Sequence, residues 1–470
     1  MGESHGGATT IDTLADDVLL EIFDFYRKNH INPLLPRPIW EWHLLVHVCR
    51  RWRHIIFESP RRLDLQILCT YKTFRKDLGI WPAFPLAIHL YSLEPLTLND
   101  EDNAVAALKH PDRVYTVRLS VTRSQLGKMA AVMQEPFPVL KYLEIYSKDG
   151  YAPDLPAEFL GGSAPCAHKI TLCGIPYPAL PTLLLSTSGL VALDLRSIPQ
   201  TGYISPEIMV TSLAALPSLE SLTINFLWLT SRPDRDLPPL VTRTVIPSLT
   251  SFYFEGVCEY LEDLVARIDS PKLNRLISYL DHDVGPHVTQ LSKFIDRSGC
   301  SKLSSFRRAE VTFYLDWVAF DLHCQRSFGT ATCATIQFET PGWDLFEMAR
   351  ALRQFSSTFS TVFHLELELE ETYKVDQADD VEWLSLLRQF SALKVLYVSR
   401  ELARPVALEL ETITAEMVAE VLPFLDLVYL EDQPPSSVEK FVASRRYTDH
   451  PVTVVSSETE FDQRIESHRR

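Results

Sequence analysis

The sequence has little of several features that mark special classes of protein. It has 16 glycines in 470 residues and no Cys-x-x-Cys pair, which excludes a collagen-like chain, a zinc ribbon and the common dithiol redox motif. No apolar run approaches the ~20 residues of a membrane-spanning helix. Basic residues number 45 against 61 acidic ones, and the net charge of -16 argues against general affinity for nucleic acid or anionic lipid. We therefore expect neither nucleic acid nor a membrane as a partner.

The cysteines and the N-terminus predict a cellular compartment. Eight cysteines are scattered along the chain, and no Asn-x-Ser/Thr glycosylation sequence occurs. Residues 1–7 lack the basic start and the apolar stretch of a secretory signal. We expect reduced, mostly buried cysteines and a protein of the cytoplasm, the nucleus or both.

The composition is that of an ordinary globular chain, with 46% hydrophobic and 23% charged residues. Its length predicts about two to four domains, or one long repetitive domain. Proline is abundant at 31 residues, which indicates many short elements that end at regular intervals.

The first fifty or so residues after a Gly/Ser/Thr-rich start predict a small helical region. Residues 1–10 are expected to be disordered, and 11–62 form the first domain. Asp16 and Asp17 suit the start of a helix whose apolar stripe includes Leu19 and Ile22. Three prolines predict a loop over 32–38, and a second helix is expected over 42–57.

This region resembles an F-box of the fungal type. The resemblance rests on Leu14-x-Asp-Asp-Val-Leu-Leu-Glu-Ile-Phe, on Leu-x-x-Val-Cys-Arg-Arg-Trp-Arg from Leu45 to Arg53, and on the Ser-Pro-Arg-Arg-Leu that ends at Leu63. Two features depart from the family pattern: Ala15 replaces its usual proline, and a long loop over 27–41 separates the first helices.

The resemblance implies that these helices bind a Skp-type adaptor and, through it, a cullin. The residues expected to face the adaptor are Leu14, Leu19, Ile22, Phe23, Leu45, Val48 and Trp52. The alternative is a plain helical hairpin that caps the following domain and buries its apolar stripes there.

A strand-and-helix repeat follows to the C-terminus. The strands have a Leu-x-x-Leu-x-Leu-like pattern, as at 140–145, 190–195, 219–224, 249–254, 393–398 and 425–430. Helices with capping sequences at Thr122 and Ser205 separate these strands, and a helical crossover favours parallel pairing.

We expect an α/β chain with a short all-α F-box followed by an irregular leucine-rich-repeat-like solenoid. The solenoid spans 63–455, and a charged tail spans 456–470. Residues 281–333 fit the repeat worst, and a two-layer α/β domain would give a similar pattern.

The sequence contains no familiar catalytic motif. Gly-x-Ser-x-Gly, the P-loop and Gly-x-Gly-x-x-Gly are all missing. Asp281, His282, Asp283 and His287 form the nearest approach to a metal site, but this pattern is more typical of a polar loop. His323 and Cys324 would point to opposite faces of a strand. We expect no enzyme, no metal and no cofactor.

A solenoid predicts a binding surface where alternate strand residues point away from the helices. The residues expected to contact a substrate protein are His89, Arg118, Glu144, Asp194, Thr223, Tyr253, Tyr397 and Tyr429, with Thr171 and Gln337 at equivalent positions. Any solvated strand face would also be polar. The acidic run at 366–371 is interpreted as an edge strand and a loop.

Together these expectations describe a substrate-receptor subunit of an SCF-type (Skp–cullin–F-box) ubiquitin ligase, which holds an unknown substrate protein. The alternative is a leucine-rich-repeat interaction scaffold that does not assemble a ligase.

Overall fold

The structure is a computed structural model in which the chain forms two compact units, residues 1–167 and 168–470. The residues predicted to be disordered, 1–10, and the predicted boundary at 62 lie outside the described residues. The described residues are 11–29, 41–59, 66–69, 83–91, 97–150, 154–227, 242–281, 288–298, 306–326, 329–339, 344–370, 381–414, 417, 420–446, 450–457, 459, 461 and 464.

The first unit begins with a helical module. A 3-10 turn, η1 (Ile11–Thr13), precedes the helices α1 (Asp16–Asn29), α2 (Glu41–Val48) and α3 (Arg50–Glu58). The single helix predicted over 42–57 is wrong, because the backbone is extended at Cys49. The sulfur of Cys49 accepts a hydrogen bond from the backbone N–H of Trp52 at 3.4 Å, so this residue caps α3 and separates it from α2.

The Cys-Arg-Arg-Trp-Arg segment holds this module together. Trp52 packs on Phe23 of α1 with ring centroids 4.8 Å apart. Arg51 reaches back to the start of α1, where it contacts Asp16 at 2.6 Å and donates to the carbonyl of Leu14 at 2.5 Å. Arg53 donates to the carbonyl of Val46 at 3.0 Å. These contacts join all three helices.

Parallel strands with intervening helices complete the first unit. Helices α5 (Leu98–Leu108) and α6 (Arg123–Ala130) each begin with a capping box, at Thr97 and at Thr122, of which the sequence predicted the second. The strands are β1 (Ile67–Leu68), β2 (Leu86–Leu90), β3 (Val114–Val121) and β4 (Tyr142–Ser147), and a 3-10 turn, η2 (Phe159–Gly162), follows them.

The second unit continues the pattern over a larger, mostly parallel sheet. Its strands, in their order across the sheet, are β5 (Lys169–Cys173), β6 (Ala192–Ile198), β7 (Ser221–Phe226), β9 (Ser251–Val257), β11 (Arg275–Asp281), β14 (Gly329–Glu339), β13 (Trp317–Arg326), β12 (Arg308–Phe313), β15 (His364–Leu369), β16 (Val395–Val398), β17 (Leu427–Leu430) and β18 (Thr453–Val455). Strands β8 (Thr244–Val245) and β10 (Ile268–Asp269) form a separate parallel pair.

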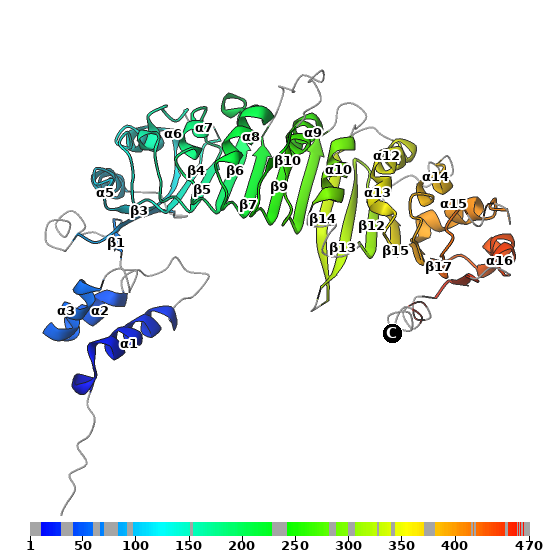
Figure 1. Cartoon of the computed structure of the whole chain (residues 1–470), viewed down its shortest axis with the longest axis horizontal. Helices are drawn as coiled ribbons and strands as arrows, with labels where there is room; N and C mark the ends of the chain where they lie inside the picture. The colour runs from blue at the N-terminus through cyan, green and yellow to red at the C-terminus, as the bar shows by residue number, and fades with distance from the viewer. Residues whose placement is uncertain are drawn as a thin grey trace, which may run out of the picture. The chain divides into compact units, whose positions relative to one another are not determined.

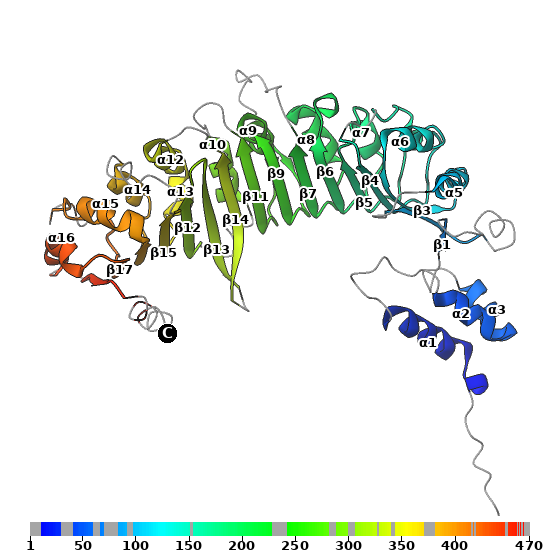
Figure 2. The same cartoon turned by 180° about the vertical axis from the view of Figure 1, so that it is seen from behind.

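The helices of this unit lie along one side of its sheet (Figure 1), and Figure 2 shows the same arrangement from behind. Successive side chains of a strand point to opposite faces of the sheet, and the apolar face is the one that the helices cover. In β7, for example, Leu222, Ile224 and Phe226 are buried while the residues between them are half-buried. The helices are α7 (Leu180–Leu184), α8 (Pro206–Ala214), α9 (Cys258–Arg267), α10 (Thr289–Arg297), α12 (Leu345–Leu352), α13 (Ser356–Phe359), α14 (Trp383–Leu387), α15 (Arg400–Leu410) and α16 (Glu439–Arg445), with 3-10 turns η3 (Gln200–Gly202), η4 (Arg353–Phe355) and η6 (Pro435–Val438).

A three-stranded meander breaks the repeat where the sequence fitted it worst. Strand β13 is antiparallel to both of its neighbours, β12 and β14. Strand β14 pairs in parallel with β11, and β12 pairs in parallel with β15, so the parallel order resumes on both sides. The prediction of parallel strands throughout is therefore wrong at β13. The hairpin supplies two long strands that no helical crossover separates.

The same hairpin corrects the prediction for two cysteines. Cys324 of β13 and Cys333 of β14 form a disulfide, with Cα atoms 6.3 Å apart. The antiparallel pairing of the two strands brings together two residues whose spacing matches no familiar motif. Cys49, Cys69, Cys166, Cys173 and Cys258 are free thiols, as predicted.

No helix among the described residues has both the length and the apolar character needed to cross a membrane.

A half-buried glutamate links neighbouring helices of the second unit. Glu262 of α9 accepts hydrogen bonds from the backbone N–H groups of Gln290 and Leu291, at 2.8 and 2.6 Å. It therefore supplies the cap that the first turn of α10 lacks in its own sequence. Burial raises the pKa of Glu262 to about 7, and the two backbone donors only partly oppose this effect.

This raised pKa predicts that stability falls as the pH rises. Between an unfolded pKa near 4.5 and a folded pKa of about 7, the folded chain binds the extra proton, so stability is lost as the pH rises through this window. The loss is on the order of 3 kcal/mol. In urea unfolding between pH 5 and 8, the free energy of unfolding should fall less with rising pH for Glu262→Gln than for wild type. The exposed Glu207→Gln of α8 is the control, and equal pH dependence in all three chains would contradict the prediction.

Candidate interaction surfaces

Helix α1 carries a second apolar stripe, which no other described residue of the module covers. Val18, Ile22 and Phe25 recur at i, i+4 and i+7, and 45%, 39% and 69% of their surface is exposed. Val48 of α2 is 58% exposed. Exposed apolar side chains aligned on one helix face are typical of a protein-binding surface.

The residues predicted to face an adaptor divide into core and surface. Leu19 and Phe23 are 0% and 1% exposed, so their side chains are not available to a partner in this structure. Leu14, Leu45 and Trp52 are half-buried, whereas Ile22 and Val48 are exposed.

Sequence reasoning missed Val18 and Phe25. Their helical spacing with Ile22 was visible in the sequence, but the neighbouring stripe that became the core has the same apolar character. The signal that could have identified them is that α1 is apolar on two sides, one more than its own core needs.

In the first unit, the strand residues predicted to bind a substrate lie in one row. His89 pairs in register with Arg118, and Arg118 pairs with Glu144. The guanidinium of Arg118 lies 3.5 Å from the carboxylate of Glu144, and all three residues are half-buried.

In the second unit, the predicted residues belong to a longer row across the face of the sheet away from the helices, which we call the open face. The register joins Asp194, Thr223, Tyr253, Ile277, Thr335, Asp321, Glu310, Glu366, Tyr397 and Tyr429. Gln337 lies on the same face, two residues after Thr335. Sequence reasoning missed the middle of this row because the meander of β12 to β14 does not have the leucine pattern.

Residues at the β5 end of the row are committed to local contacts. Thr171 pairs with Asp194 but is 0% exposed, so it does not belong to the accessible surface. Asp194 accepts from Arg196 at 2.8 Å, and Tyr253 donates to Glu255 at 2.6 Å.

The centre of the open face carries a charged patch, formed by seven side chains. Arg308 binds Glu366 and lies 3.7 Å from Glu310. His364 lies 2.9 Å from Glu366, and His323 lies 3.5 Å from Glu310. The patch comprises Arg308, Glu310, Asp321, His323, His364, Glu366 and Glu368.

Three carboxylates of the patch differ in how readily they ionise. The close approach of His323, 3.5 Å away, lowers the pKa of Glu310. Burial opposes ionisation of Glu366, but His364 and Arg308 outweigh burial and lower its pKa. Burial, reinforced by Glu310 and Glu366, raises the pKa of Glu368. Oxygens of these three groups lie within 4.8 Å of one another, a spacing that could hold a metal ion, but Arg308 already supplies positive charge between two of them.

The acidic run of the sequence is therefore not at an edge. Strand β15 pairs with β12 on one side and with β16 on the other, and Glu366 is 9% exposed. The interpretation as an edge strand is wrong, because the alternating glutamates line the open face of a central strand while Leu365 and Leu367 face the helices.

An aromatic patch adjoins the charged patch. The rings of Tyr397 and Tyr429 stack with centroids 4.9 Å apart. Phe461, from the predicted C-terminal tail, packs on both, at 5.8 Å from Tyr397 and 5.0 Å from Tyr429. Tyr429 is consequently only 4% exposed. The aromatic patch consists of Tyr397, Tyr429 and Phe461, and Val395, Leu427 and Val455 pack beside them in the same cluster.

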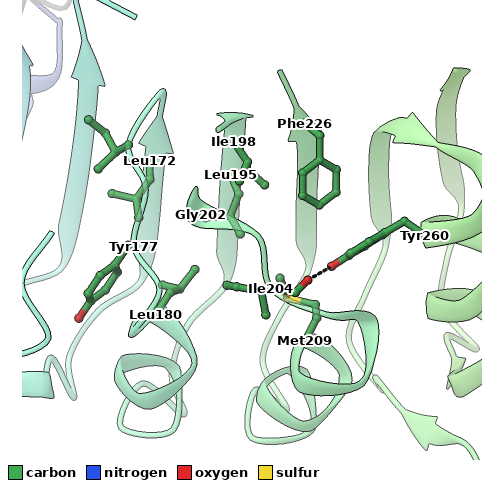
Figure 3. A pocket seen from close by; sticks show the side chains of 11 residues that line it. Leu172, Tyr177, Leu180, Leu195, Ile198, Gly202, Ile204, Met209, Phe226 and Tyr260 are labelled. Carbon is green, nitrogen blue, oxygen red and sulfur yellow. Dashed lines mark hydrogen bonds between the residues drawn. The ribbon is translucent and has the colours of Figure 1, made fainter. Parts of the chain in front are cut away.

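On the helix side, a small internal void lies between β5 to β7 and the adjacent helices (Figure 3). Its free volume of about 20 Å³ suits a single water-sized molecule. Its lining is apolar, and the hydroxyl of Tyr260 is turned to the carbonyl of Ile204 at 2.9 Å. The void is a packing feature of the core. Asp194 of β6 and Thr223 of β7, both predicted as binding residues, lie on the opposite face of their strands.

No protein-family model and no curated protein matches this chain. Among solved structures, the chain is similar to one described as "Crystal structure of Rad7 and Elc1 complex in yeast". The sequence identity is 10%, the TM-score is 0.29, and the alignment covers 95% of this chain and 94% of that chain. Similarity at this level is too low to transfer either the fold or the function of that protein.

Proposed function

We propose that this protein is the substrate-receptor subunit of an SCF-type ubiquitin ligase. In this proposal the helical module binds a Skp-type adaptor, and the open face holds a substrate protein. The protein itself catalyses nothing: it raises the concentration of substrate lysines near the ubiquitin-loaded conjugating enzyme, in the cytoplasm or the nucleus.

The observation that carries the proposal is the exposed stripe of Val18, Ile22 and Phe25. A hairpin that only capped the next domain would bury its apolar residues there, whereas α1 buries Leu19 and Phe23 and still exposes a second stripe. The stripe lies on the very helix whose sequence resembles an F-box.

The polar and aromatic character of the open face supports the second half of the proposal. Tyrosine and arginine are enriched in protein interfaces, and the open face carries both, at Tyr397 and Arg308. The meander also places Glu310 and His323 on this face.

Co-expression with a Skp-type adaptor and a cullin, followed by purification of the complex, tests the proposal. We expect the full-length chain to elute with both in one complex on size exclusion, and substrates cross-linked to the complex to map to the open face. A folded chain that binds other proteins through the open face but never the adaptor would contradict ligase assembly and favour the interaction scaffold.

A further inference from the structure

The turn between β12 and β13 places two stacked aromatic rings on the open face. The backbone N–H of Tyr314 donates to the carbonyl of Trp317 at 2.8 Å, and the two rings lie nearly parallel with centroids 3.3 Å apart. Alternation along the strands puts both side chains on the same face as Glu310, because the adjoining Phe313 and Val318 are buried on the helix side. Both rings are half-buried, so a ligand can reach them.

Carboxylates lie on both sides of the Tyr314–Trp317 pair. Trp317 pairs in register with the exposed Glu339 of β14. The backbone N–H of Glu370, the exposed residue directly after β15, donates to the carbonyl of Phe313 at 3.0 Å, so Glu370 follows the register and lies beside Tyr314. Six carboxylates therefore occupy the open face of β12 to β15 among the described residues: Glu310, Asp321, Glu339, Glu366, Glu368 and Glu370.

Arg308 shows which cation this face already binds. It is the only arginine or lysine among the described open-face residues of β12 to β15, and its guanidinium binds Glu366 and lies 3.7 Å from Glu310. No hydrogen bond or ion pair joins the side chain of Glu368 to another described residue, and burial, together with Glu310 and Glu366, raises its pKa. A second guanidinium beside Glu368 would relieve this repulsion between like charges.

The rings and the carboxylates are close enough for one ligand to contact both. Burial raises the pKa of Tyr314, and Glu370, Glu368 and Glu310 raise it further, so their charges act on its hydroxyl. A guanidinium is planar, stacks on tyrosine and tryptophan rings and pairs with carboxylates, whereas the lysine ammonium is a compact and strongly hydrated charge. The combination of stacked rings with carboxylates therefore favours arginine.

We propose that the open face of β12 to β15 is a docking site for an arginine-bearing segment of a partner protein, with one guanidinium on the Tyr314–Trp317 pair and a neighbouring one beside Glu368. In an extended segment alternate side chains point the same way, about 7 Å apart, and adjacent strands of the sheet are about 4.8 Å apart, so two such arginines can reach neighbouring strands. The proposal rests on the proposed function only in identifying that partner as the substrate of the ligase.

A fluorescein-labelled peptide, Ser-Arg-Ser-Arg-Ser-Arg-Ser, provides the probe, and fluorescence anisotropy measures its binding to the full-length chain. Two matched peptides carry lysine or glutamine in place of the three arginines. The arginine peptide should bind about threefold more tightly than the lysine peptide and about tenfold or more tightly than the glutamine peptide. Its affinity should fall as the salt concentration rises, because salt screens the attraction to the carboxylates.

Matched variants of the chain locate the site. Trp317→Ala should weaken binding of the arginine peptide about tenfold, whereas Trp317→Phe keeps an aromatic ring in the turn and should weaken it less than about threefold. Glu368→Gln should weaken it about threefold. Tyr253→Ala, on the open face outside the site, and Glu207→Gln, an exposed acid of α8, should bind like wild type. A thermal melt of each variant checks that it is folded.

Equal affinity of the wild-type chain for the arginine and glutamine peptides would overturn the docking site, and equal affinity for the arginine and lysine peptides would overturn the preference for arginine. Unchanged binding by folded Trp317→Ala or by folded Glu368→Gln would also contradict the site. Equal weakening by Glu207→Gln and Glu368→Gln would show that the peptide responds only to the net charge of -16, which also counts against it.

The titration contains neither adaptor nor cullin. Its failure would therefore leave adaptor capture unaffected, and a failure of adaptor capture would leave the docking site in place.

Discussion

Replacing Ile22 and Phe25 of α1 with glutamate is expected to lower capture of a Skp-type adaptor by about a hundredfold or more, with little change in the melting temperature. Both side chains are exposed, so the substitutions remove no internal packing, and each places a charge on an apolar contact surface. Pull-down of purified adaptor by the full-length variant, with a thermal melt of the same sample, measures both quantities.

A control substitution at a residue of similar exposure separates this effect from a general loss of folded protein. Ile208 of α8 is 50% exposed and lies far along the sequence from the module, so Ile208→Glu should leave adaptor capture intact. Unchanged capture by the Ile22 and Phe25 variant would contradict the role of the stripe.

The substitutions that the sequence alone would suggest are poorer tests. Leu19 is fully buried and Trp52 packs on Phe23, so changing them to alanine removes packing from the module, at about 2–5 kcal/mol for a buried leucine. If a variant with alanine at Leu19 or Trp52 no longer captured the adaptor, unfolding of the module would explain the loss as well as a missing contact would.

Arg445→Ala is expected to destabilise the C-terminal end of the second unit by about 3–5 kcal/mol. Arg445 of α16 is 1% exposed, and its guanidinium donates to the carbonyls of Leu422, Pro423 and Leu425 at 2.9, 3.3 and 2.8 Å. Leu422 holds a left-handed backbone, with φ of 55°, so this turn needs the bonds that fix it.

Hydrogen exchange monitored by mass spectrometry should show the loss first in β16 to β18, because repeats depend mainly on their neighbours. The adjacent Arg446 is exposed, and Arg446→Ala should change the unfolding free energy by less than about 0.5 kcal/mol. Equal stability of the two variants would contradict a structural role for Arg445.

Much of the repeat could be predicted because its signals are local. The leucine pattern at 190–195, 219–224 and 249–254 corresponds to β6, β7 and β9, and the caps predicted at Thr122 and Ser205 are present. Each of these signals acts within one strand or one helical turn, so residues close in sequence suffice to determine it.

The candidate surfaces could be predicted only in part. The strand rows of His89, Arg118 and Glu144, and of Asp194, Thr223 and Tyr253, follow from alternation. The charged patch could not be found, because β13 runs antiparallel and aligns Asp321 with Glu310 and Glu366 across three strands. Which apolar stripe of α1 faces inward was equally undetermined, since both have helical spacing.

By itself, the sequence determined most of the strand-and-helix order of the repeat, the alternation of side chains along its strands and the resemblance of the N-terminal helices. Only the tertiary structure decided that Leu19 and Phe23 are core, that Cys324 and Cys333 pair, and that Phe461 covers Tyr397 and Tyr429. The reason is that helix and strand periodicity assigns a side chain to a face, whereas the partner on that face comes from a distant segment brought there by the fold.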